Sequence, residues 1–244
     1  MLATSSPVGG HPAEGDELDP DGAQLMSKRL VQRMCRAQGL PISPECCTQL
    51  YLNGCRFRAL HGLEEYCSVR VLHLENNCLT ECSALVHMTG LRALYLQQNA
   101  LRVVPCLTAC TCLVSLNLSG NPVSGLQPGS LPASLLTLQV AATGLGSRED
   151  MTALAQDCSN LQVLDLQAAS ELSSPQALPA LACLRCLRVL YLQRTPLAQL
   201  PNLRWGGWRD QEELHEGTYT LHAIPARPTS GVGSSVCDLH VTCV

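Results

Sequence analysis

The sequence predicts an α/β solenoid, in which short parallel strands stack along the concave side of a curved, right-handed coil. An eleven-residue phrase occurs seven times, and its clearest copies are LRALYLQQNAL (91–101) and LVSLNLSGNPV (113–123). The form L-x-x-L-x-L-x-x-N/C-x-L is that of a leucine-rich repeat, which contributes one strand and one turn. We therefore expect a horseshoe of about seven repeats with a capping helix at its N-terminal end.

The spacing of the copies indicates one continuous array. The phrase begins at Cys47, Val69, Leu91, Leu113, Leu135, Leu161 and Leu187. The first five beginnings are 22 residues apart, and each of the last two follows its predecessor by 26 residues. The longer repeats leave room for a helix on the outer face, and we expect helices at 149–158 and 174–184.

Alternation along each strand separates the core from the concave face. Successive residues of a strand point to opposite sides, so the fourth and sixth positions, nearly all leucine, face inward. The fifth position then faces the concave surface. At the ninth position Asn77, Asn99 and Asn121 can bond the backbone of adjoining turns, whereas Ala169 cannot. We therefore expect the C-terminal third of the array to be less stable.

Three further segments flank the repeat domain, which is predicted over 47–204. Residues 1–20 are rich in Pro, Gly and acidic residues and are typical of a disordered leader. Residues 21–46 hold a predicted capping helix over 21–39, with Asp21 and Gln24 as a capping box. Residues 205–244 follow no sustained period, and we expect an irregular, poorly ordered tail.

Composition indicates the compartment in which we expect the protein and the kinds of partner that we do not expect. The formal net charge is −4 over 244 residues, which gives no general affinity for polyanions. The sequence contains no apolar stretch of membrane-spanning length, and its N-terminus lacks the regions of a secretory signal. The 15 cysteines, an odd number, are then expected as free thiols in a reducing compartment. We expect a monomeric, cytoplasmic protein that contacts neither membrane nor nucleic acid.

No motif predicts catalysis, and neither a cofactor nor a metal is expected. The chain lacks a Gly-rich phosphate loop, a G-x-S-x-G turn and an H-E-x-x-H helix. Cys183-x-x-Cys186 has the spacing of a redox or zinc motif, but no second ligand pair lies near it in the sequence. Because other cysteines precede their repeats in similar places, we interpret both as buried structural thiols.

The fifth position of the phrase is the candidate partner-binding site. From the first repeat to the seventh it reads Tyr51, His73, Tyr95, Asn117, Gln139, Asp165 and Tyr191. This column is polar, aromatic at both ends and free of Lys and Arg, which disfavours nucleic acid. Aromatic residues are effective protein contacts, although strands also favour tyrosine for packing between neighbours. Because solenoids commonly bind through their concave surface, we predict contact residues here.

The second position of the phrase carries Arg70, Arg92 and Arg188. Arg70 and Arg92 belong to successive repeats and would be neighbours on one rim of the sheet. We interpret these arginines as a solvated rim. The alternative is that they meet an acidic patch of a partner.

The N-terminal part of the repeat array resembles a known family. A short basic helix from Met26 is followed by a tyrosine-containing first strand and a phrase similar to F..I.NLE.Y..L..L.LE.N. The matching residues are Phe57, Leu60, Leu63, Glu64, Tyr66, Leu72, Leu74, Glu75 and Asn77. Later strands, in LNLSGNPV, LTLQV and LQVLDL, fit the same pattern. Over about 26–203 the chain resembles the leucine-rich-repeat axonemal dynein assembly factors.

This resemblance implies a non-catalytic scaffold for the cytoplasmic preassembly of axonemal dynein arms, needed for motile cilia and flagella. Its partners would be dynein subunits or assembly chaperones. The chain departs from the family after RTPLAQLPNLR, where Pro201, Asn202 and Arg204 are kept and unrelated sequence follows from Trp205. Family members also continue well beyond this length. The resemblance therefore implies a truncated or divergent member.

Other classes of function remain open on the sequence. A phosphatase regulatory subunit built from 22-residue repeats would hold a catalytic subunit on the same face. A structural axonemal dynein light chain, or another axoneme component that binds tubulin, would stay with the axoneme. A redox or zinc protein would depend on Cys183 and Cys186.

Overall fold

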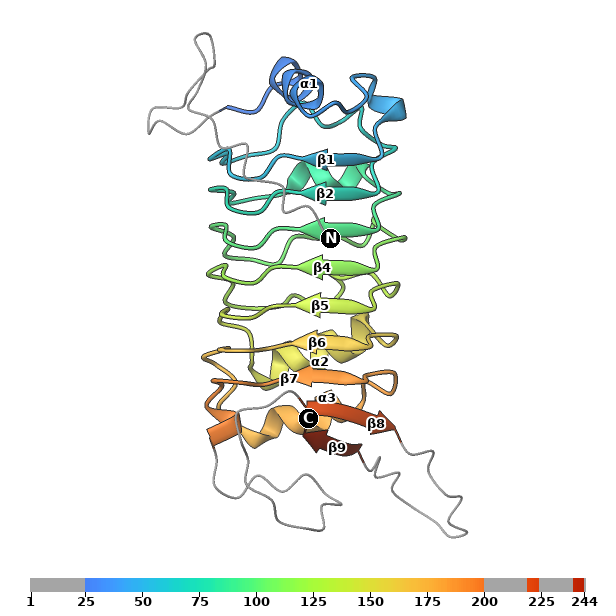
Figure 1. Cartoon of the computed structure of the whole chain (residues 1–244). Helices are drawn as coiled ribbons and strands as arrows, with labels where there is room; N and C mark the ends of the chain where they lie inside the picture. Colours follow the sequence, from blue (N-terminus) through green and yellow to red (C-terminus); the bar gives the residue numbers. More distant parts are fainter. Residues whose placement is uncertain (1–24, 200–218, 224–238, 244) are drawn as a thin grey trace.

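The described residues form a stack of parallel strands, one from each repeat (Figure 1). The computed structural model describes residues 25–199, 219–223 and 239–243. The seven strands are β1 (Gln49–Tyr51), β2 (Val71–His73), β3 (Ala93–Tyr95), β4 (Ser115–Asn117), β5 (Thr137–Gln139), β6 (Val163–Asp165) and β7 (Val189–Tyr191). Each pairs in parallel with the next, and equivalent phrase positions lie opposite one another throughout. The predicted solenoid of seven repeats is confirmed.

Leucine side chains fill the interior between the sheet and the outer turns. In every repeat the residues at the fourth and sixth positions are at most 2% exposed. The residue at the first position, from Cys47 to Leu187, is buried to the same degree. Burying one leucine contributes about 1.5–3 kcal/mol, so the recurring set of three supplies most of the stability of each repeat.

The turn after each strand contains a residue in the left-handed backbone conformation. These residues occupy the eighth position, with φ between +52° and +68°: Gly54, Asn76, Gln98, Gly120, Ala142, Ala168 and Arg194. Residues other than glycine rarely adopt this conformation because of steric crowding. The turn is held by hydrogen bonds between repeats, since the N–H of Asn76 donates to the carbonyl of Gln97 at 3.0 Å and later repeats continue this pattern.

Asparagine at the ninth position joins neighbouring turns. The amide nitrogen of Asn99 donates to the carbonyls of Leu74 and Leu96, both at 2.9 Å. Its Oδ1 accepts a hydrogen bond from the N–H of Leu79 at 3.0 Å. Asn77 and Asn121 bond their neighbours in the same way. One side chain therefore satisfies backbone groups from two successive repeats.

The later repeats lack this cross-link. The hydroxyls of Thr143 and Thr195 donate only within their own repeats, to the carbonyls of Val140 and Leu192. Ala169 has no side-chain polar group. Side-chain bonds of the asparagine type therefore join only the first four repeats, which is the physical basis for expecting lower stability toward the C-terminal end.

Helix α1 (Lys28–Ala37) covers the first repeat. It begins after Ser27, whose extended backbone allows its hydroxyl to accept a hydrogen bond from the N–H of Leu30 at 3.3 Å. Residues 25–27 are not helical, so the predicted start at 21 is wrong; Asp21 and Gln24 themselves lie outside the described residues. The side chain of Gln38 donates to the carbonyl of Tyr51 at 2.9 Å, on an edge strand that pairs only with β2.

Short helical segments lie between and beyond the strands, the longer ones behind the sheet in Figure 1. They are η1 (Pro44–Cys46), η2 (Ser83–His87), α2 (Arg148–Asp157), η3 (Pro175–Ala177), α3 (Leu178–Ala182) and η4 (Leu197–Gln199). The helix predicted at 149–158 is confirmed by α2, with Ser147 and Asp150 forming its capping box. The helix predicted at 174–184 is shorter than expected and is divided between η3 and α3.

Two aspartates fasten α2 to the preceding repeat. The carboxylate of Asp150 accepts hydrogen bonds from the N–H groups of Leu126 at 2.8 Å and of Ser147 at 3.1 Å. The carboxylate of Asp157 accepts from the N–H of Gly129 at 2.8 Å and from the next two residues. These contacts give the C-terminal half a link between repeats that the asparagines do not supply there.

Beyond β7 the sheet changes direction. Strand β8 (Tyr219–Ala223) pairs antiparallel with β7, and β9 (Leu239–Cys243) pairs antiparallel with β8. The expectation of an irregular segment over 205–244 is wrong for these two strands, and the rest of that segment lies outside the described residues. Apolar and polar residues alternate in both strands, but each strand is short and its partner is distant in the sequence, so no sustained period marks them.

We predict that Asn99→Ala lowers the free energy of unfolding by about 3 kcal/mol, because it removes three buried hydrogen bonds worth about 1 kcal/mol each. Thr143→Ala removes a short bond to the carbonyl of Val140 and a long, weak one from the N–H of Leu145, both within one repeat, and should cost about 1 kcal/mol. Urea unfolding followed by circular dichroism measures both. Equal losses in the two variants would contradict the cross-linking role of asparagine.

We predict that Ala142→Gly stabilises the protein by about 0.5–1 kcal/mol, because glycine adopts the left-handed conformation without steric cost. Ala142 is exposed and has a φ of +52°, so its methyl group contributes little packing. The control is Ala155→Gly inside α2, which should destabilise the protein by about 1 kcal/mol. Urea unfolding followed by circular dichroism measures the stability of both variants, and a loss of stability in both would refute the prediction.

Candidate functional site

The seven candidate contact residues lie in one row along the sheet. Each is the last residue of its strand, from Tyr51 in β1 to Tyr191 in β7, and the parallel register sets each beside the next. Six of them are half-buried, as expected for the surface of a sheet. Their contact with a partner stays a prediction.

Three aromatic rings stack at the N-terminal end of this row. The ring of His73 lies between those of Tyr51 and Tyr95, with centroid distances of 4.8 Å and 4.5 Å and interplanar angles of 20° and 14°. Neighbouring strands are about 4.8 Å apart, so equivalent side chains in constant register meet at stacking distance. Stacked aromatic pairs contribute about 0.5–1.5 kcal/mol beyond the burial of their area, which holds the three rings as a rigid surface.

Two polar residues beside the stack were not among the predicted contact residues. Glu75 and Gln97 occupy the seventh position of the second and third repeats, and Oε1 of Glu75 lies 3.3 Å from Nδ1 of His73. Among the described residues, the buried atoms Oε2 of Glu75 and Oε1 of Gln97 have no hydrogen-bond partner. A buried acceptor without a donor costs about 1–3 kcal/mol. A ligand N–H group would recover this free energy once a rotation of the side chain brought the buried oxygen to the surface.

The C-terminal part of the row differs because its polar groups already have partners. Oδ1 of Asn117 accepts a hydrogen bond from the N–H of Ser119, and Oδ1 of Asp165 accepts one from the N–H of Gln167, both at 3.0 Å. Asp165 was expected on the exposed face but is buried, with 9% of its surface exposed. Burial raises the pKa of its carboxyl group, and the hydrogen bond to Gln167 opposes this shift.

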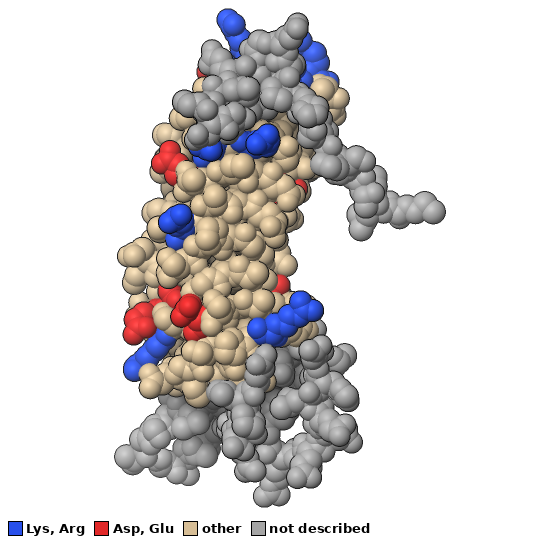
Figure 2. Space-filling model, turned by 90° about the vertical axis from the view of Figure 1, so that its left-hand side faces the viewer, with Lys and Arg blue, Asp and Glu red and all other residues tan. Residues whose placement is uncertain are grey.

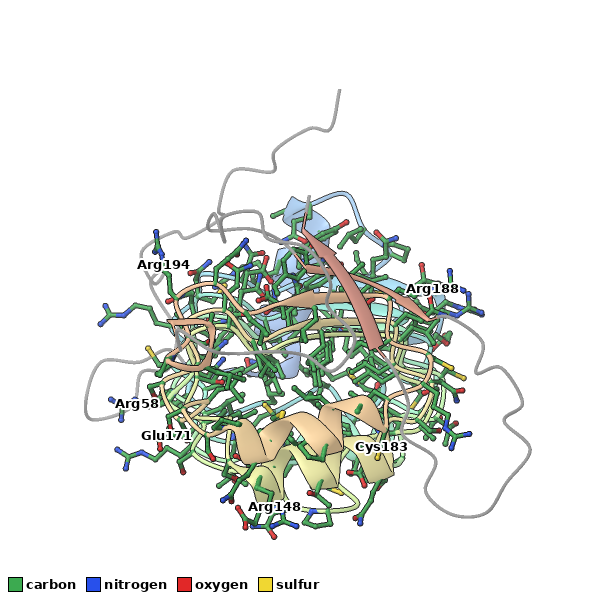
Figure 3. The ribbon with its side chains drawn as sticks, turned by 90° about the horizontal axis from the view of Figure 1, so that it is seen from below. Arg58, Arg148, Glu171, Cys183, Arg188 and Arg194 are labelled. Atoms are coloured by element: carbon green, nitrogen blue, oxygen red, sulfur yellow. The ribbon has the colours of Figure 1, made fainter. Side chains whose placement is uncertain are left out.

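The concave columns are slightly acidic. The third, fifth and seventh positions of the seven repeats contain two carboxylates, Glu75 and Asp165, and no Lys or Arg. The predicted rim arginines, Arg70, Arg92 and Arg188, are exposed and immediately precede β2, β3 and β7. In Figure 3, Arg188 and Arg194 lie on opposite sides of the solenoid and point away from the strands. Figure 2 shows that charged residues are also sparse on the side toward which the strands run.

The prediction that Cys183 and Cys186 are buried is wrong, since both thiols are exposed. Leu184 and Leu187 take the neighbouring buried positions instead. Of the other cysteines that precede a repeat, Cys110 and Cys158 are buried, as predicted, whereas Cys67 and Cys112 are exposed. Within the described ranges, no group of three or more His, Cys, Asp or Glu residues is arranged to hold a metal ion.

A groove of about 520 Å³ lies on the convex side, where α2 and α3 face each other. It is lined by Arg148, Thr152, Ala155, Gln156, Gln176, Pro179, Ala180 and Cys183. Figure 3 shows Arg148 and Cys183 on this side of the molecule, opposite the sheet. Arg148 is the one charged residue among these lining residues, so the groove lacks the paired groups that acid–base chemistry needs.

Comparison with known proteins agrees with this architecture. The family model described as Leucine Rich Repeat matches residues 112–133. No curated protein matches the chain significantly. Among solved structures, an internalin (inlF) from Listeria monocytogenes is similar, with a TM-score of 0.53, 21% identity, and coverage of 68% of this chain and 52% of that one. TLR13, in a complex with ssRNA13, has a TM-score of 0.51, 22% identity, and coverage of 65% of this chain and 23% of that one.

These similarities define the class of the protein. The chain spans about half of the internalin chain and less than a quarter of the TLR13 chain. Likeness at this level of identity establishes the fold alone. Together with the constant register, the buried leucines and the asparagine cross-links, it identifies a leucine-rich-repeat solenoid. Of the helices in the described part of the chain, none is long and apolar enough to cross a bilayer.

We predict that native protein is alkylated at the exposed thiols and spared at the buried ones. Burial raises the pKa of Cys82 and Cys158 to about 12, so little thiolate forms at neutral pH. Hydrogen bonding to Thr108 lowers the pKa of exposed Cys106, which should react faster than the other exposed thiols. Iodoacetamide labelling followed by peptide mass spectrometry measures each rate.

In urea all cysteines should react at similar rates, which serves as the control. Fast native labelling of Cys82 or Cys158 would show that the convex side opens readily. Protection of Cys183 and Cys186 would contradict their exposed positions.

Proposed function

We propose that this protein is a non-catalytic scaffold that binds another protein through its concave sheet. The observation that carries this proposal is the row from Tyr51 to Tyr191, in which constant register holds half-buried aromatic and polar side chains on short, rigid strands. Little conformational entropy is lost when such a surface binds, because its side chains are already ordered. Extended surfaces of this kind are the usual binding faces of solenoids.

We further propose that the partner is an axonemal dynein subunit or an assembly chaperone, and that the protein acts in the cytoplasmic preassembly of dynein arms for motile cilia and flagella. The support is the resemblance over about 26–203, whose more specific part is the N-terminal helix joined to the first repeat. In this region Phe57, Leu63 and Tyr66 are fully buried. Lys28 in α1 pairs with Glu65 at 2.6 Å, so helix and loop are in contact. The N-terminal helix and the loop after the first strand, which carry much of the resemblance, therefore pack together as a cap on the first repeat.

We predict that the double variant Asn117→Arg/Gln139→Arg loses its partner. Both side chains are half-buried in the middle of the row, so two added cations and their bulk should reduce partner recovery by about 10-fold or more. The matched control is Thr152→Arg/Gln156→Arg, which adds the same charge at exposed positions of α2. Affinity capture from ciliated-cell cytosol, quantified by mass spectrometry, compares the two.

The outcomes separate the classes of function. Equal recovery by both double variants, with unchanged melting temperatures, would refute binding through the concave face. Dynein chains or assembly chaperones in the wild-type eluate support preassembly. A phosphatase catalytic subunit without them supports the phosphatase regulator, and retention of the protein in salt-extracted axonemes supports a structural light chain.

Depletion of the protein tests the preassembly role directly. Electron microscopy of axonemes from depleted cells should show missing inner or outer dynein arms. Intact arms after complete depletion would reject this role while leaving protein binding by the concave face unaffected.

A further inference from the structure

We propose that the concave face receives an arginine side chain of its partner, placed along the Tyr51–His73–Tyr95 stack and bonded to Glu75 and Gln97. This inference rests on the proposed protein-binding function and names the chemistry of one contact. It follows from the charge of the face, the unpartnered acceptors and the aromatic rings beside them.

The charge of the face favours a cationic group. Glu75 is one of the two carboxylates in the concave columns, which contain no Lys or Arg. The nearest rim arginines in sequence, Arg70 and Arg92, stand at the other end of their strands. Five residues of strand separate Arg70 from Glu75, which corresponds to about 16 Å. The rim arginines are therefore too far from Glu75 to pair with its carboxylate.

The geometry of the acceptors favours arginine over lysine. Glu75 and Gln97 occupy the same phrase position in neighbouring repeats. The N–H of Asn76, the residue after Glu75, donates to the carbonyl of Gln97, so the two repeats are adjacent at this position. Their unpartnered oxygens therefore belong to rungs about 4.8 Å apart. A guanidinium group presents five N–H donors in one plane and can bond two such acceptors at once, whereas an ammonium group is a point charge.

The aromatic stack supplies the remaining contact. Arginine stacks on aromatic surfaces, and its aliphatic stem packs against apolar area while the charged end reaches a polar group. His73 already lies 3.3 Å from Oε1 of Glu75, so the stack and the carboxylate are in contact. An arginine bonded to Oε2 of Glu75 would therefore lie against the same rings.

The second carboxylate of the face is a poorer site. Asp165 is buried, and one of its oxygens already accepts the N–H of Gln167 at 3.0 Å. Its neighbours in the row are Gln139 and Tyr191, so no aromatic stack of three rings lies beside it. The structure therefore assigns the arginine contact to the N-terminal end of the row.

The test is an NMR titration of isotope-labelled full-length protein with the blocked tripeptide acetyl-Gly-Arg-Gly-amide. We expect saturable shifts of the Gln97 side-chain amide and the Glu75 carboxyl carbon, with a Kd of roughly 1 mM because a single side chain binds. The neutral isostere, with citrulline in place of arginine, should bind about 10-fold more weakly because the charge-assisted bonds are absent. Raising the ionic strength should weaken only the arginine peptide.

Glu75→Gln should lower the affinity for the arginine peptide by about 10-fold, since it removes the charge at constant shape. Gln97→Leu provides a second variant that keeps the charge and removes one acceptor, and it should weaken binding by a smaller factor. The matched control is Glu81→Gln, which removes an exposed carboxylate outside the concave columns and should leave binding unchanged.

Equal shifts with the arginine and citrulline peptides, or undiminished binding by Glu75→Gln, would overturn the inference. Failure of this contact differs from failure of the scaffold function. If Asn117→Arg/Gln139→Arg loses the partner while Glu75→Gln keeps it, the concave face still binds protein and only the arginine contact is refuted. If neither variant loses the partner, binding lies elsewhere on the molecule.

Discussion

The constant parallel register of successive repeats is the constraint on which the rest of the molecule depends. In the first six repeats the left-handed residue donates its N–H to the following repeat, and every repeat places three side chains in the core. A shift of one residue would turn the leucines to the surface and the concave row into the core, so apolar burial enforces the register. The same register sets His73 between two tyrosines. The candidate binding surface is thus a consequence of how the core is packed.

Different side chains satisfy the polar backbone groups of the turns at different points along the solenoid. Each repeat leaves turn carbonyls and N–H groups inside the coil, where they need partners. In the first four repeats, Asn77, Asn99 and Asn121 bridge successive turns. In the fifth repeat, Asp150 and Asp157 of the outer helix α2 bind the loop of the fourth repeat. The polar groups that hold the coil are therefore distinct from those proposed to contact a partner.

Several sequence predictions failed where the answer depended on distant contacts. The start of α1 was misplaced because Asp21 and Ser27 are both suitable capping residues, and only packing on the first repeat selects between them. Cys183 and Cys186 were expected to be buried, but Leu184 and Leu187 fill the core there and both thiols face outward. Asp165 was expected to be exposed, and its burial depends on the neighbouring strands. Strands β8 and β9 pair across long separations that no local period reveals.

The sequence by itself determined the period, the core and the residues of the concave column, because a repeat of 22 to 26 residues with leucines at fixed positions admits one way of burying them. The tertiary structure decided which of those column residues touch one another. The stack of Tyr51, His73 and Tyr95 arises between repeats, whereas His73 and Glu75 pair within one repeat. The stacked residues are 22 positions apart in the sequence. Their separation in space is set by the pitch of the coil, which exists only in the folded chain.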